Sequence, residues 1–140
     1  MEDIDGRSVV HKWSAHPKNV GLARAELRSV LESWWLSFLG DSATLVLSEL
    51  MTRVVWSYTG RSGQIETRFV RVRGGVRIEV RSPLPDDVRK TGRGDLWGPG
   101  LLLVAGLSDR WGLADRGELG EVAWAALVPL RWERGGVVRG

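Results

Sequence analysis

The sequence contains no cysteine and only two histidines among its 140 residues. The absence of cysteine excludes disulfides, thiolate chemistry and thiolate-bound metals. His11 and His16 lie near the N-terminus without companion ligands, so we expect no metal site. No stretch reaches the roughly 20 apolar residues that a membrane-spanning helix requires. Residues 1–7 begin with acidic side chains and lack the apolar core of a secretory signal. We therefore expect a cytoplasmic protein without a membrane partner.

Lysine is scarce as well, since it supplies only Lys12, Lys18 and Lys90 among 20 basic residues. The many arginines are scattered among acidic residues, and the formal net charge is only +3. A nucleic-acid-binding protein usually concentrates its positive charge in a patch or stripe. We therefore expect no specific nucleic-acid partner. An arginine-rich, lysine-poor and glycine-rich composition is typical of a high-GC genome such as that of an actinobacterium.

Tryptophan is the residue in excess, with eight copies in a chain of this size. They cannot all be fully buried in so small a core, so some are expected to mark a pocket or an interface. Trp34 and Trp35 are the candidates for partner contacts, because adjacent helix positions point about 100° apart and cannot face the same core. We expect one of the two to be exposed. The alternative that one of them merely covers the helix end stays open.

Two amphipathic helices are predicted in the first 60 residues. Pro17 suits the first position of a helix, where its missing N–H would be unpaired in any case. Apolar residues then recur at spacings of three and four, which predicts a helix over about 17–36. Gly40-Asp41-Ser42 ends that helix and offers a cap for the second, which we place over about 42–58.

The apolar period then changes from 3.6 to 2, and Gly74-Gly75 is a hairpin signal between two strands. A loop of the length that follows is uncommon unless it is functional or disordered. We expect strands over 11–15, 64–72 and 76–81, a loop over 82–97, a short helix within 98–109, and strands over 110–115 and 121–128.

This order of elements predicts an α+β fold: a two-layer α/β sandwich with helices on one face of a mostly antiparallel, mixed sheet. We expect a single domain over residues 11–130. Residues 1–10 and the Arg/Gly-rich tail over 131–140 are expected to be flexible ends.

Several segments, in order along the chain, resemble motifs of one family. They are 20–31 (VGLARAELRSVL), 45–52 (LVLSELMT), 98–104 (GPGLLLV), 108–112 (SDRWG) and 120–124 (GEVAW). The second resembles the N-box helix, and the third the glycine box, of the anti-sigma regulatory kinases, a branch of the GHKL ATPases. The resemblance covers about residues 11–128 and implies the Bergerat/GHKL ATPase fold.

The resemblance also implies an ATP site between the helices and the long loop, which would act as a lid. Glu49 stands where the family has its general base, and Arg53 where an Asn holds Mg²⁺. Ser82 stands where an Asp accepts the adenine amino group. Gly98 and Gly100, followed by Leu101, match the box whose backbone approaches the phosphates at a helix N-terminus. Such proteins bind sigma factors and phosphorylate a serine of a small antagonist protein.

The chain departs from that pattern at four nucleotide-facing positions. A guanidinium at Arg53 has no acceptor atom and repels a cation, and Arg53 is placed to pair with Glu49 four residues earlier. Ser82 lacks the charge of an Asp, while Pro99 and Glu121 replace an Arg and a Lys. We therefore expect weak or absent binding of ATP or ADP, and no Mg²⁺. The alternative is that Arg53 contacts phosphates directly without metal.

The eroded motifs favour a regulatory protein over a catalyst. We expect a pseudokinase that docks a sigma factor or an anti-sigma antagonist in partner switching of transcription control. A homodimer stays open. The alternative function is an active serine kinase that phosphorylates the antagonist and uses Glu49 as its base.

Overall fold

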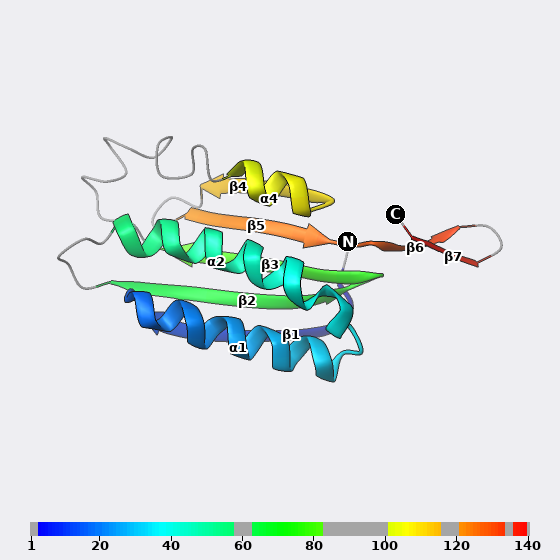
Figure 1. Cartoon of the computed structure of the whole chain (residues 1–140), viewed down its shortest axis with the longest axis horizontal. Helices are drawn as coiled ribbons and strands as arrows, with labels where there is room; N and C mark the ends of the chain where they lie inside the picture. The colour runs from blue at the N-terminus through cyan, green and yellow to red at the C-terminus, as the bar shows by residue number, and fades with distance from the viewer. Residues whose placement is uncertain (1–2, 58–62, 83–100, 116–120, 134–135, 140) are drawn as a thin grey trace.

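The computed structural model describes residues 3–57, 63–82, 101–115, 121–133 and 136–139. An antiparallel sheet of five strands, in the order β1-β2-β3-β5-β4, carries the helices on one face (Figure 1). In chain order the elements are β1 (Asp3–Ser14), α1 (Pro17–Ser33), the 3-10 turn η1 (Ser37–Leu39), α2 (Gly40–Ser57), β2 (Gln64–Val72), β3 (Gly75–Ser82), α4 (Leu101–Leu107), β4 (Arg110–Asp115), β5 (Glu121–Leu127), β6 (Leu130–Glu133) and β7 (Gly136–Arg139).

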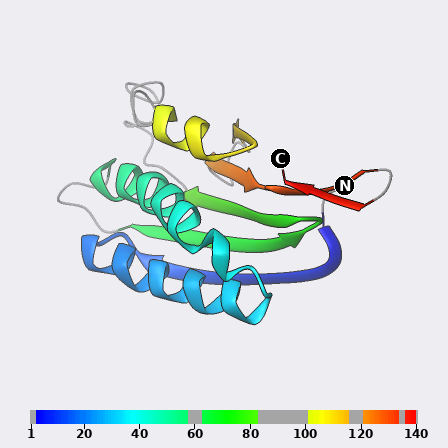
Figure 2. The same ribbon diagram turned by 45° about the vertical axis from the view of Figure 1, so that its right-hand side comes forward.

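The expected α+β class is confirmed, and the arrangement is compatible with a two-layer sandwich. Figure 2 shows α1, α2 and α4 on the same side of the sheet. The sheet differs from the expectation in one respect. Each of its described strand pairs is antiparallel, so it is not mixed. Even β3 and β5, which are separated in the chain by α4 and β4, run in opposite directions.

The structure describes strands at both ends of the chain, beyond those expected from the sequence. Strand β1 starts at Asp3 instead of His11, and Asp3 pairs with Val72 of β2 across an irregularity in the register. The tail holds strands β6 and β7, which pair as a separate two-stranded sheet. In both places the ladder consists of backbone hydrogen bonds, which do not require the alternating apolar pattern that the sequence lacks there.

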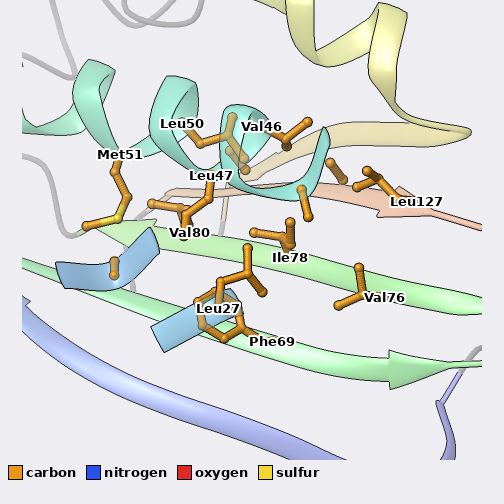
Figure 3. Close-up of a cluster of buried hydrophobic side chains, with 14 of the residues drawn as sticks. Leu27, Val46, Leu47, Leu50, Met51, Phe69, Val76, Ile78, Val80 and Leu127 are labelled. Carbon is orange, nitrogen blue, oxygen red and sulfur yellow. The ribbon is translucent and has the colours of Figure 1, made fainter. Parts of the chain in front are cut away.

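The core lies between the helices and the sheet. Figure 3 shows Leu47 and Met51 of α2 above Ile78 and Val80 of β3, with Leu27 of α1 beside Phe69 of β2. All of these side chains are buried. Their alternation along β2 and β3 is the period-2 pattern read from the sequence, and it fixes which face of each strand meets the helices.

Candidate functional site

The residues predicted to face a nucleotide come from elements that meet at one end of the molecule. The C-terminal half of α2, the C-terminal end of β3 and the N-terminal end of α4 lie together there (Figure 1). Glu49 and Arg53 belong to α2, Ser82 is the last residue of β3, and Leu101 is the first residue of α4. Gly98 and Gly100 lie outside the described residues. The fold therefore brings the described members of the set to the same end.

Glu49 and Arg53 form an ion pair on α2, as their spacing predicted. Arg53 Nη2 donates to Glu49 Oε2 at 3.3 Å, and the two side chains are 30% and 33% exposed. A pair of this kind, one helical turn apart and partly solvated, stabilises a helix by about 0.3–0.5 kcal/mol. The interaction is weak energetically, but it places a cation against Glu49, the carboxylate at the position where the resemblance implies a general base.

Ser82 is buried at the end of β3, opposite Glu121 of β5 in the sheet register. Because side chains alternate along a strand, it lies on the same face as Val80 and Ile78, which point toward α2 in Figure 3. The side chain of Ser82 is therefore on the helix side of the sheet, where it could contact a ligand bound between the sheet and the helices. Its hydroxyl is a neutral donor and acceptor, which can hydrogen-bond but cannot supply a negative charge.

Ser48 is a polar residue beside Glu49 to which the sequence motifs gave no role. Its hydroxyl oxygen is buried and has no hydrogen-bond partner in the described part of the chain. Nothing in the sequence distinguishes this serine from one that bonds to its own helix backbone. The unpaired, buried hydroxyl of Ser48 can be recognised only once the packing around α2 is known.

Trp34 and Trp35 lie in different environments because helix α1 ends just before them. Trp34 caps the helix and is buried in the core, so it is not accessible to a partner. Trp35 is 87% exposed and has a positive φ of 62°. The expectation that one of the two is exposed is confirmed, but partner contact at Trp34 is not compatible with its burial. The helix also ends at Ser33, before the predicted position 36.

A Schellman motif explains this ending. The backbone N–H of Leu36 donates to Leu31 O at 2.8 Å, and that of Trp35 donates to Glu32 O at 3.1 Å. Leu36 and Leu31 are both buried, which is the apolar contact that accompanies this motif. The residue in the left-handed position is usually glycine, because a Cβ there costs roughly 1–2 kcal/mol. Trp35 is the one non-glycine residue with positive φ in the described chain.

We expect Trp35→Gly to raise the free energy of unfolding by about 1 kcal/mol, because the strain is relieved while no buried contact is lost. Thermal denaturation should show a midpoint about 3 °C higher. Trp35→Ala is the matched control, since it also removes the indole but keeps a Cβ and should bring no gain. A glycine variant less stable than the wild type would contradict the left-handed conformation.

No group of three His, Cys, Asp or Glu side chains is placed to hold a metal ion in the described ranges. None of the described helices has the length and apolar character needed to cross a membrane.

Comparison with known proteins adds no family assignment. No family model matches the chain, and no curated protein matches it in sequence. The case for a family therefore depends on the motifs in the sequence and on where the fold puts them.

Proposed function

We propose that this chain is a cytoplasmic regulatory domain of the GHKL type, which acts by docking a protein partner and has a weak or lost ATP site. The carrying observation is the ion pair between Arg53 and Glu49. In the family that the motifs resemble, these two positions hold the metal ligand and the general base. Here the first is a cation and the second is held by it.

The chemistry of this pair argues against metal-assisted phosphoryl transfer. Mg²⁺ takes oxygen ligands, and a guanidinium offers none. A general base must contact the attacking hydroxyl, and Glu49 Oε2 instead accepts from Arg53 Nη2 at 3.3 Å. Ser82, where the resemblance expects an Asp, weakens adenine recognition in the same direction. The changes are independent in sequence and agree in their consequence.

The arrangement of α2, β3 and α4 supports the GHKL part of the proposal. The N-box-like segment lies on α2, the residue at the adenine position ends β3, and the segment after the glycine box forms α4. All three converge at one end of the sheet (Figure 1). This is the disposition that the resemblance requires for a site between the helices and the intervening segment.

Trp35 supports the docking part of the proposal. Trp35 is 87% exposed and is held at a positive φ of 62°, and backbone strain of this kind clusters at functional sites. Exposed tryptophans are enriched among the residues that dominate binding energy at interfaces. The proposed partner is a sigma factor or an anti-sigma antagonist, and a second copy of the chain is the other occupant to be tested.

Titration of the purified protein against a panel of sigma factors and antagonist proteins from the same genome tests this function. We expect one of them to bind without nucleotide, and Trp35→Ala to weaken that binding about 30-fold, which corresponds to roughly 2 kcal/mol. Trp56→Ala is the matched control, because Trp56 is also exposed but lies near the opposite end of the helical layer. Phosphate transfer from ATP to a serine of an antagonist would instead support the kinase alternative.

A further inference from the structure

One face of the sheet carries none of the described helices and gathers charges from strands that are distant in the sequence. Phe69 and Ile78 point toward the helices in Figure 3, so their neighbours along β2 and β3 point to the opposite side. The cross-strand register extends this assignment to β1, β5 and β4. We call this side the open face. Its cationic side chains are Lys12, Arg68, Arg77, Arg81 and Arg110.

Among the strand residues whose side chains are described, two carboxylates, Glu66 and Glu79, share the open face with these five cations. Over these described side chains the cations outnumber the carboxylates by three. Four of the arginines that are scattered in the sequence are thus brought together by the fold. A basic surface of this kind is the electrostatic footprint of a polyanion-binding protein.

The carboxylates lie deeper than the cations that they hold. Glu79 is 16% exposed and contacts Arg77 at 3.0 Å and Arg68 at 3.7 Å. Glu66 is 25% exposed and contacts Arg81 at 3.6 Å. Arg68 and Arg81 are more exposed, at 43% and 35%. The outermost layer of the face is therefore positive, and the guanidinium groups are already oriented by the acidic groups beneath them.

An aromatic group lies within this charged layer. The guanidinium of Arg77 lies over the ring of Trp124 at 4.3 Å from its centroid. The ring of Trp124 in turn lies close to Gly112 of β4, where a Cβ would come within 2.9 Å of its Nε1. Unpaired bases stack on aromatic side chains and on the planes of Arg guanidinium groups. A carboxylate-rich protein surface would form ion pairs with the cations but has no bases to stack on Arg77 and Trp124.

We propose that the open face binds single-stranded nucleic acid through its phosphate backbone, without preference for base sequence. The charge complementarity supplies the attraction, and the sheet supplies a flat area about 20 Å across its five strands. The binding is independent of the nucleotide site and of Trp35, which belong to the helical layer and its connections. Neither phosphate contacts nor base stacking depends on the base sequence, so no sequence-specific patch is required.

Fluorescence anisotropy with a labelled oligouridylate of about 20 nucleotides tests the proposal, at salt concentrations from about 50 to 200 mM. The variant is Lys12→Gln with Arg68→Gln, which removes two charges from the open face. The control is Lys18→Gln with Arg24→Gln, which makes the same chemical change on α1. Circular dichroism and thermal denaturation establish that both variants are folded, and Lys12→Gln alone serves if the double variant is not.

We expect wild-type binding to weaken as salt rises, because counterions are released from the phosphates. The open-face variant should flatten the slope of log K against log salt by about 1.4, at about 0.7 for each lost contact with a single strand. The α1 variant should keep the wild-type slope. Absence of binding at low salt, or an equal loss in both variants, would overturn the proposal. Binding of polyglutamate or of anionic lipid vesicles through the same residues, with equal or higher affinity than RNA, would also overturn it.

Discussion

Gly75→Ala is expected to destabilise the protein by about 3 kcal/mol or more, or to prevent folding. A Cβ at this position would lie 1.8 Å from Leu127 O and 2.8 Å from its carbonyl carbon, both backbone atoms of β5. Backbone in the middle of a sheet cannot move aside as the end of a flexible side chain can. The β3-β5 pairing, which joins the two halves of the sheet, would have to open at its end.

Urea denaturation measures this effect, and Gly21→Ala is the matched control. Gly21 lies in helix α1, and a Cβ there meets nothing within 4 Å. The same chemical change should therefore stabilise the protein by about 0.5–1 kcal/mol, because alanine favours the helix. A Gly75 variant as stable as the wild type would show that β3 and β5 do not approach each other as closely as described.

Restoring the family residues, Arg53→Asn together with Ser82→Asp, is expected to strengthen Mg·ATP binding about ten- to a hundred-fold. A hydrogen bond to a charged group contributes about 1.5–3 kcal/mol, which corresponds to that range of affinity. The asparagine supplies an oxygen ligand for the metal and releases Glu49 from its ion pair. The aspartate supplies a charged acceptor for the adenine amino group, at a buried position on the helix side of β3.

Two control variants separate these contributions. Arg53→Ala releases Glu49 without adding a metal ligand, and Ser82→Asn changes the shape of the side chain without adding charge. Both should leave Mg·ATP affinity close to that of the wild type. Because a buried, unpaired carboxylate is costly, the Ser82→Asp protein must be checked for folding, and Arg53→Asn alone gives the metal-dependent part. If the double variant gained no affinity, the assignment of these positions to a nucleotide site would fail.

The helices and central strands could be predicted from the sequence because their apolar periods are strong. The predicted second helix differs from α2 by two residues at its start, and the strand over 64–72 matches β2. The extension of β1 to Asp3 and the β6-β7 pair could not be predicted, because their ladders are formed by backbone groups and not by an apolar pattern. Gly75 was read as a hairpin residue, whereas the structure also requires it for contact with β5.

Within the candidate site, the sequence could predict only contacts between residues that are close together on one helix. The contact of Glu49 with Arg53 followed from their spacing of four residues. The left-handed conformation of Trp35 depends on the hydrogen bonds that close α1, and glycine would have been the expected residue there. The positive layer on the open face depends on the strand order, since Lys12, Arg68 and Arg110 come together only after the sheet has formed.

Arg53 and Ser82 are proposed to weaken or abolish Mg·ATP binding at the positions where the resemblance implies a nucleotide site. Calorimetric titration of the wild-type protein with ATP and ADP, each with and without Mg²⁺, tests it most directly. We expect no detectable heat, or weak binding that Mg²⁺ does not improve. Weak binding that is lost in Arg53→Ala would identify Arg53 as a phosphate ligand without metal. Micromolar binding that depends on Mg²⁺ would contradict the proposed loss of the ATP site and would indicate an active kinase.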